Sequence, residues 1–215
     1  MIEELLDGAS PRSIRKLWQG AQLHRPMLTM LKHEVLQFIT RNNSRACWIE
    51  TGTYKGQTTQ FLSTLCDRVY SCEASEKLYQ HALERTQNNQ NISLRLGTSE
   101  QWLPEFLSEL YPANVNIFLD SHYSGFGTDG SGNDLFPDTY LGENDPPVLA
   151  ELDIIAKHTE GTEQVSIIID DFHHFTQEHK MPGYPDADEF INWAKYHGYH
   201  WNVIQDMFIL KNYRG

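Results

Sequence analysis

Three aspartates that follow two apolar runs of the chain have the residue types of a metal site. Asp120 ends the run at 116–120, and the adjacent Asp170 and Asp171 end the run at 165–171. Carboxylates gathered at neighbouring strand ends repel one another unless a cation or a proton lies between them, and oxygen ligands suit Mg²⁺ or Mn²⁺. We therefore expect the three aspartates to bind a divalent cation. The alternative is that they cap helices or bond to loop backbone.

A glycine-containing turn is the second candidate site. The segment 48–58 reads W-I-E-T-G-T-Y-K-G-Q-T, an apolar strand that passes through Gly52 and Gly56 into a helix. The glycines would let the backbone approach a ligand, and the helix N-terminal amides with the Thr58 hydroxyl could receive a carboxylate. The spacing E-x-G-x-x-x-G differs from the dinucleotide pattern, and Glu50 would attract an ammonium group. An amino-acid-like zwitterion fits both ends of this turn.

Glu73 ends the next β-rich run, 17 residues after Gly56. In an open α/β sheet this position lies beside the same crevice, where a carboxylate can accept hydrogen bonds from ribose hydroxyls. Glu73 could also be a solvated acid at a strand end. Together with Glu50 and the glycines, it favours a ligand that joins a nucleoside to an amino acid.

The elements that position these residues alternate in type along the chain. Short β-rich runs alternate with longer amphipathic ones, which predicts βαβ units around a parallel sheet. Two leading helices are expected between Pro11 and Thr40. The last two strands are joined by two residues, too few for a crossover, so they should pair antiparallel. The expected strands are 46–50, 68–73, 92–96, 115–120, 165–170, 199–204 and 207–211, and the expected helices are 57–66, 76–88, 100–110, 147–158 and 186–197, with Ser75 and Ser99 as N-caps.

Composition narrows the class of protein. The 215 residues include 17 Lys and Arg against 29 Asp and Glu, a net charge of −12, which argues against nucleic acid or anionic lipid as a partner. The sequence has neither a membrane-spanning run nor a secretory leader, which predicts a cytoplasmic protein. Its three cysteines lack zinc-site spacing and are expected to be reduced and structural.

The segment 121–145 is longer than ordinary connections and rich in glycine and acids, so we expect a lid or a binding loop.

The candidate residues resemble the motifs of class I S-adenosylmethionine-dependent methyltransferases, in particular the small metal-dependent O-methyltransferases. The resemblance covers about 46–211 and implies a Rossmann-like, doubly wound, seven-stranded sheet. It implies that Glu50, Tyr54 and Thr58 hold the amino and carboxylate groups of the cofactor's methionine part, and that Glu73 holds the ribose. The remaining cofactor positions that it implies are Gly52, Gly56, Thr98, Ser99 and Asp120.

The three aspartates resemble the metal ligands of the macrocin-type sugar O-methyltransferases. In those enzymes an acid two positions after the metal Asp looks like the general base, and His122 stands at that position here. In the catechol type a lysine three positions on has this role, and here that residue is Tyr123. We predict His122 as the base because its ordinary pKa lies near neutrality; the alternative is a histidine that anchors the lid. Of His173 and His174, one is expected to line the substrate pocket.

The sequence thus predicts an S-adenosylmethionine-dependent, Mg²⁺- or Mn²⁺-dependent O-methyltransferase. Its expected parts are an N-terminal helical cap at 1–43 and a methyltransferase domain at 44–215. The expected acceptor is a small molecule, a saccharide or a sugar-bearing natural product, and the sequence is compatible with a homodimer. Two alternatives stay open, a metal-dependent hydrolase on the same fold and a non-catalytic S-adenosylmethionine-binding partner protein.

Overall fold

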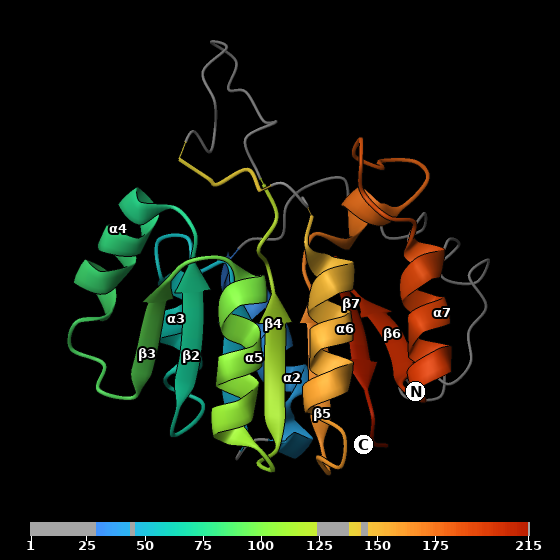
Figure 1. Ribbon diagram of the computed structural model, residues 1–215, viewed down its shortest axis with the longest axis horizontal. Coiled ribbons are helices and arrows are strands. Elements are labelled where there is room, and N and C mark those ends of the chain that lie inside the picture. The colour runs from blue at the N-terminus through green and yellow to red at the C-terminus, as the bar shows by residue number, and fades with distance from the viewer. Residues whose placement is uncertain (1–28, 44–45, 124–137, 143–145, 215) are drawn as a thin grey trace.

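The computed structural model of the protein describes residues 29–43, 46–123, 138–142 and 146–214 (Figure 1). The first of the two expected leading helices and most of the expected lid lie outside the described residues. The described helices are α2 (Thr29–Ile39), α3 (Gln57–Leu62), α4 (Glu76–Thr86), α5 (Ser99–Leu110), α6 (Val148–His158) and α7 (Ala187–His197), with short 3₁₀ turns η2 (Arg41–Asn43) and η3 (Phe172–Phe175). The strands are β1 (Cys47–Thr51), β2 (Val69–Glu73), β3 (Ile92–Leu96), β4 (Val115–Leu119), β5 (Val165–Ile169), β6 (His200–Ile204) and β7 (Met207–Lys211).

The described residues form a seven-stranded sheet in the order β3-β2-β1-β4-β5-β7-β6. Strands β1 to β5 pair in parallel, and β7 pairs antiparallel with both β5 and β6. The predicted doubly wound sheet with a C-terminal hairpin is therefore confirmed. Ser75 caps α4 as predicted, since its side chain accepts from the Leu78 amide. The N-cap prediction for Ser99 is wrong, because Thr98 is the N-cap of α5 and Ser99 is its first helical residue.

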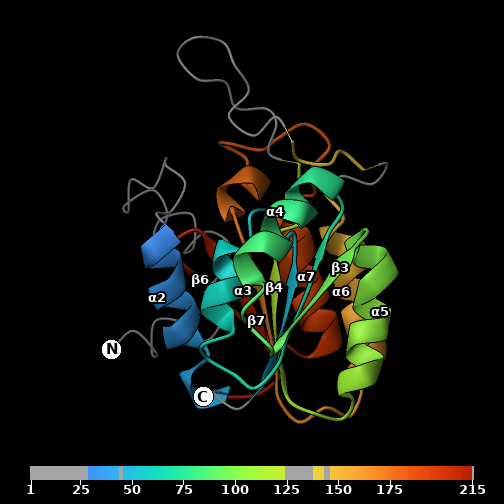
Figure 2. The same cartoon turned by 90° about the vertical axis from the view of Figure 1, so that its left-hand side faces the viewer.

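Helices cover both faces of the sheet (Figure 2). Helices α5, α6 and α7 pack on one face, where the larger hydrophobic cluster includes Phe106, Leu152 and Phe190. Helices α2 and α3 cover the other face through a smaller cluster that includes Leu36 and Leu62. Within the described residues α2 therefore shares a hydrophobic core with the sheet, and the proposed division between residues 43 and 44 stays a prediction.

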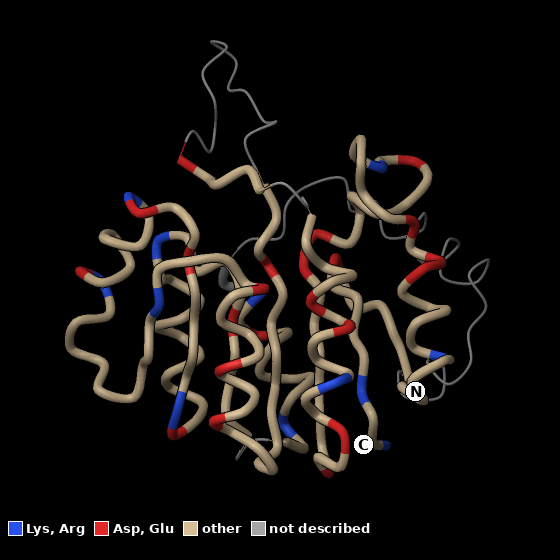
Figure 3. Tube along the Cα trace, in the orientation of Figure 1, with Lys and Arg blue, Asp and Glu red and all other residues tan. Residues whose placement is uncertain are grey.

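Three smaller expectations concern the whole molecule. All three cysteines lie in the described part of the chain, and all are free thiols. No described helix combines the length and the apolar character that crossing a membrane requires. Acidic positions outnumber basic ones along the described trace (Figure 3), in line with 29 acidic and 17 basic residues in the sequence.

The pleat of the central strands brings the acidic residues to one face of the sheet. Phe118 and Ile168 belong to the cluster under α2 and α3, and side chains two residues apart on a strand point to the same face. The ladder continues past the strand ends, since the Asp120 amide donates to the Thr51 carbonyl and the Asp170 amide to the Leu119 carbonyl, both at 3.0 Å. Asp120 and Asp170 therefore point toward the face that α2 covers.

Candidate active site

The three predicted metal ligands lie together at the carboxyl ends of β4 and β5. Asp120, Asp170 and Asp171 each offer a ligand atom, and these atoms lie within 4.8 Å of one another. Asp170 is buried, and its Oδ1 atom has no hydrogen-bond partner among the described residues. An unpartnered buried carboxylate oxygen is costly unless a cation or proton satisfies it, so the donor set fits a hard divalent cation. We call these three residues the acid triad.

Lys32 of α2 also reaches the acid triad, and sequence analysis missed it. Its ammonium donates to Asp170 Oδ2 and lies 3.6 Å from Asp120 Oδ2. Burial by itself would lower the pKa of Lys32, but the charges of Asp120 and Asp170 raise it above the ordinary value. The ammonium therefore stays charged and neutralises part of the triad. In a sequence, a lysine in an amphipathic helix is most simply interpreted as solvent-exposed. No sequence signal therefore indicated that Lys32 contacts the acid triad.

His122 lies against the same acids. Its Nε2 atom is 3.1 Å from Asp171 Oδ2, and its Nδ1 atom is 3.8 Å from Asp120 Oδ1. Burial opposes the protonated form, yet the hydrogen bond and charge of Asp171, with the other two aspartates, raise the pKa of His122 to about 9. The premise of an unperturbed pKa near neutrality is therefore wrong. At neutral pH His122 is therefore protonated and donates to Asp171.

His173 and His174 follow the triad in η3. The His173 amide donates to Asp206 Oδ1 at 2.8 Å, and its Nδ1 atom lies 2.5 Å from Asp206 Oδ2. The two histidine rings are 3.8 Å apart, and His174 also meets Tyr184 edge to face at 6.0 Å. Asp206 comes from the turn of the β6–β7 hairpin, where the sequence suggested only a connection. The hairpin thus orients His173 beside the acid triad.

Glu50 is enclosed by the protein at the start of the glycine turn. It is 1% exposed, and its Oε2 atom accepts from Thr59 Oγ1 at 2.5 Å and from Ser71 Oγ at 2.7 Å. Thr59 of α3 is therefore the hydroxyl that bonds this acid, whereas Thr58 is half-buried at the start of the same helix. In this arrangement Glu50 ties α3 and β2 to β1. Its direct contact with a cofactor stays a prediction.

Glu50 should make the stability of the protein depend on pH. Burial raises the pKa of Glu50 to about 8, against about 4.3 in an unfolded chain. Between these pH values the folded state keeps a proton that the unfolded state has released, so the free energy of unfolding should fall as pH rises from about 5 to about 8. In Glu50→Gln this part of the fall should vanish. Urea unfolding at both pH values measures the change in the free energy of unfolding. Glu76→Gln is the control and should show the same change as the wild type. An equal change in all three proteins would mean that Glu50 is not the group that titrates.

Glu73 closes the other side of the glycine turn. Its carboxylate accepts from the Tyr54 amide at 2.7 Å and from the Ser75 amide at 2.9 Å, and only 6% of the residue is exposed. Tyr54 has a positive φ of 51°, so the turn is sharp where Glu73 holds it. Glu73 therefore stands at the predicted place, at the carboxyl end of β2 and against the turn.

The two glycines of the turn are required by neighbouring protein segments. A Cβ atom on Gly52 would lie 2.1 Å from the Asp120 carbonyl oxygen, and one on Gly56 would lie 3.3 Å from Ala82 of α4. Both have positive φ, 79° and 74°. The sequence predicted a glycine here because of close approach to a ligand. The structure shows a second reason, close approach of Gly52 to the Asp120 backbone. The absence of a side chain at Gly52 lets the turn pack on the loop after β4, which begins with Asp120.

The Thr98–Ser99 turn lies at the carboxyl end of β3, the edge strand of this half of the sheet. Ser99 is buried, and Trp102 of α5 donates to the Leu96 carbonyl at 2.9 Å to hold the turn. The contact of this turn with adenine stays a prediction.

A further buried acid nearby was not predicted: Glu151 of α6 accepts from Ser121 Oγ at 2.6 Å and so holds the residue between Asp120 and His122.

No protein-family model matches the chain. A protein-L-isoaspartate O-methyltransferase of Myxococcus xanthus (strain DK1622) is 33% identical over 105 residues, which are 48% of this chain and 48% of that protein. The chain therefore matches about half the length of this curated relative.

Solved methyltransferase structures match over most of the chain. An O-methyltransferase from Bacillus cereus in complex with S-adenosylhomocysteine has a TM-score of 0.54 at 18% identity and covers 93% of this chain and 88% of its own. The O-methyltransferase TomG from Streptomyces achromogenes, involved in tomaymycin synthesis and solved with S-adenosylmethionine, has a TM-score of 0.53 at 15% identity and covers 100% of this chain and 94% of its own. At such identities the likeness establishes the fold. The protein has the Rossmann-like fold of class I methyltransferases, with the antiparallel hairpin at its C-terminal end.

Proposed function

We propose that the protein transfers a methyl group from S-adenosylmethionine to a hydroxyl group of a small molecule, with a divalent cation at the acid triad. The observation that carries this proposal is the joint position of two sites on a methyltransferase fold. The glycine turn with Glu73 stands at the carboxyl ends of β1 and β2, and the acid triad stands at the carboxyl ends of β4 and β5. Because β1 and β4 are neighbours, Gly52 packs directly on Asp120.

The cofactor would lie across the glycine turn. Glu73 already uses each carboxylate oxygen once, and a carboxylate oxygen has a second lone pair with which to accept from a ribose hydroxyl. Tyr54 and Thr58 flank the start of α3, whose first amides can receive the methionine carboxylate. Thr98 and Ser99 would border the adenine. In this arrangement Glu50 supports the turn from behind by its bonds to Thr59 and Ser71.

Mg²⁺ or Mn²⁺ bound by Asp120, Asp170 and Asp171 would orient the acceptor hydroxyl and lower its pKa. The unpartnered Oδ1 atom of Asp170 supports this assignment. His122 is the proposed proton acceptor. Its raised pKa depends on the negative charge of the aspartates, so the role requires that this charge be neutralised first.

The acceptor should be neutral or cationic. Asp138 is the first described residue after 124–137 and pairs with Lys77 of α4 at 2.9 Å. With a net charge of −12, the protein would repel a phosphorylated acceptor or nucleic acid. A saccharide or a sugar-bearing natural product is the acceptor class that we propose. We further propose a cytoplasmic location. The proposed reaction is compatible with a monomer and with a homodimer.

S-adenosylhomocysteine should bind whether or not a divalent cation is present, because Glu73 and the glycine turn are separate from the acid triad. Glu73→Gln should weaken binding by about ten- to a hundredfold, the effect of a lost hydrogen bond to a buried charged group. Titration calorimetry measures both affinities. Glu76→Gln, on an exposed residue of α4, is the matched control and should bind as the wild type does.

The same titration separates the alternatives. A hydrolase on this fold would give no heat with S-adenosylhomocysteine, and absent binding at millimolar ligand would therefore exclude the methyltransferase. A non-catalytic binding protein would bind the ligand, yet incubation with labelled S-adenosylmethionine and a panel of hydroxylated acceptors would give no methylated product. Transfer of label to a saccharide hydroxyl would establish both the reaction and the acceptor class.

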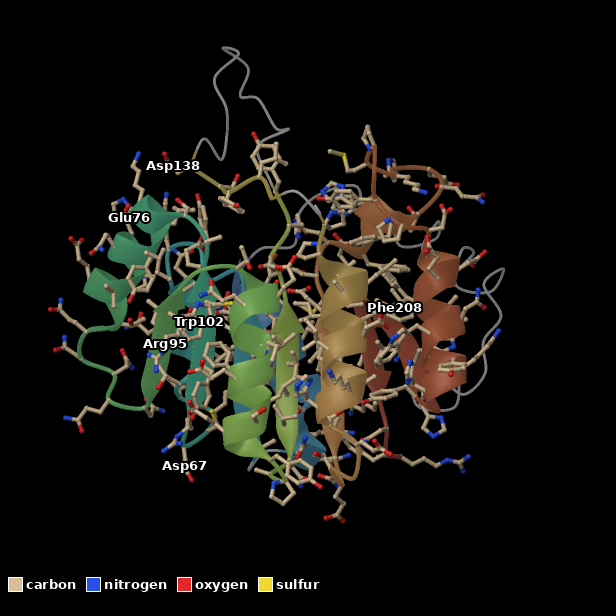
Figure 4. All side chains as sticks on the ribbon, viewed as in Figure 1. Asp67, Glu76, Arg95, Trp102, Asp138 and Phe208 are labelled. Atoms are coloured by element: carbon tan, nitrogen blue, oxygen red, sulfur yellow. The ribbon has the colours of Figure 1, made fainter. Side chains whose placement is uncertain are left out.

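Removal of one carboxylate should weaken binding of the cation. In Asp170→Asn we expect Mn²⁺ affinity to fall at least about tenfold, because a neutral amide replaces a buried anionic ligand. Asp67→Asn is the control, since Asp67 lies at the opposite end of the sheet from Glu76 and Asp138 (Figure 4). If Asp170→Asn binds Mn²⁺ as tightly as the control does, the acid triad is structural and the cation part of the proposal fails.

A further inference from the structure

The acid triad already holds a cation that belongs to the chain. Lys32 is 138 positions from Asp170 in sequence, yet its ammonium donates to Asp170 Oδ2 and pairs with Asp120 Oδ2 at 3.6 Å. The side chain of Lys32 is 17% exposed and that of Asp170 is 1% exposed, so water screens this contact weakly. The ammonium therefore lies among the oxygens that a divalent cation would need.

Lys32 alone does not reach every carboxylate of the triad. Its ammonium contacts Oδ2 of Asp120 and Oδ2 of Asp170, whereas Asp171 Oδ2 pairs with His122 Nε2 at 3.1 Å. The Oδ1 atom of Asp170 also remains without a hydrogen-bond partner among the described residues. A divalent cation could satisfy the triad more fully than the ammonium does. An ammonium and a divalent cation on the same oxygens would repel each other, which disfavours binding of both at once.

Lys32 can leave the triad while its helix stays in place. The neighbouring His33 ring stacks on Phe61 of α3, with centroids 4.1 Å apart and planes 2° from parallel. One turn further along, Leu36 is fully buried in the cluster that α2 shares with the sheet. The backbone of α2 is thus fixed by apolar contacts, whereas lysine carries its charge on a flexible four-carbon stem. Rotation of that side chain would therefore be the movement that clears the site.

We propose that Lys32 is an exchangeable internal cation: its ammonium neutralises part of the acid triad in the cation-free protein and must be displaced before Mg²⁺ or Mn²⁺ can bind. This inference rests on the cation part of the proposed function and is independent of the cofactor and the acceptor. It assigns two tasks to Lys32. The residue keeps the buried Asp170 and the neighbouring Asp120 compatible with the folded state, and it sets the concentration of divalent cation at which the site fills.

Removal of the competing charge should tighten binding of the divalent cation. For Lys32→Gln we expect an increase of at least about tenfold in Mn²⁺ affinity by titration calorimetry, and a larger rise in melting temperature on addition of Mn²⁺ than for the wild type. Lys77→Gln is the control, because Lys77 is 64% exposed and pairs with Asp138 outside the triad. Unchanged or weaker binding in Lys32→Gln would show that Lys32 supports the site and would overturn the proposal. If Lys32→Gln is too unstable without Mn²⁺ for calorimetry, the rise in its melting temperature on addition of Mn²⁺ tests the same expectation.

The wild-type protein allows a second, direct test. Brief acetylation with an amine-reactive ester, followed by peptide mass spectrometry, reports how accessible each lysine is. Lys32 should react slowly without divalent cation and at least about fivefold faster with saturating Mn²⁺, while Lys77 should react equally in both. Binding of Mn²⁺ without a change at Lys32 would overturn the exchange and leave the cation site intact. If neither wild type nor Lys32→Gln binds Mn²⁺, the exchange and the cation site both fall, and binding of S-adenosylhomocysteine then shows separately whether the methyltransferase assignment stands.

Discussion

Gly52→Ala should destabilise the protein by about 3 kcal/mol or more, and a large fraction of the variant should be unfolded. Two costs add at this position. The φ of 79° is strained for any residue with a Cβ atom, which costs about 1–2 kcal/mol. The added Cβ atom would also lie 2.1 Å from the Asp120 carbonyl oxygen, an overlap that only movement of the backbone can relieve. Urea unfolding measures the loss.

Gly198→Ala provides the matched control for this substitution. Gly198 ends α7 with a φ of 74°, nearly that of Gly52, but a Cβ atom there would meet nothing within 4 Å among the described residues. The control therefore carries the cost of the backbone conformation without the overlap. We expect the Gly198→Ala loss to be smaller by at least about 1–2 kcal/mol. Equal losses would mean that the loop after β4 shifts freely, and that the glycine turn does not fix the position of Asp120.

The fold could be predicted because its signals are local. Each of the five parallel strands is a short β-rich run that a helix follows, and the two-residue connection at 205–206 forces the last pair to be antiparallel. The acids at the ends of β4 and β5 could be predicted for the same reason. Parallel strands end at one edge of the sheet, and the pleat then puts Asp120 and Asp170 on one face.

The partners of those acids could not be predicted, because they come from elements whose sequence signals have other meanings. Lys32 lies on a helix that looks amphipathic and solvated on its polar side, and Asp206 lies in a turn where aspartate is common for local reasons. Glu151 is an acid in the first turn of α6, a position that the helix dipole favours in any protein. Only the packing of α2, α6 and the hairpin around the sheet makes these three residues neighbours of the site.

The reason for the glycines illustrates the same limit. The sequence pattern predicts that Gly52 lets the backbone approach a ligand, and the structure shows that this glycine has a positive φ. Which neighbour requires that freedom is a fact of tertiary structure, here the backbone of Asp120. The glycine turn and the acid triad are therefore in direct contact through the backbones of Gly52 and Asp120. The sequence of either segment alone does not indicate this contact.

His122→Gln should lower the rate of methyl transfer by about 10²- to 10⁴-fold, the contribution that a general base commonly makes. Glutamine is a useful substitution because its amide can still donate to Asp171, as the imidazole does across 3.1 Å. It has no basic nitrogen, however, so it cannot take the acceptor's proton. Binding of S-adenosylhomocysteine and Mn²⁺ should stay within about threefold of wild type, which separates loss of the base from loss of the site.

The control for His122 is His158→Ala. His158 ends α6, at the end of the helix remote from the acid triad, and its Nδ1 atom is bonded to the Ile154 carbonyl at 2.8 Å. This variant should turn over as the wild type does. If His122→Gln also keeps the wild-type rate, the role of His122 is to hold Asp171, and the proton must go elsewhere. The arrangement around the triad then favours His173, because Asp206 fixes the orientation of that imidazole through two hydrogen bonds, one to its ring and one to its amide.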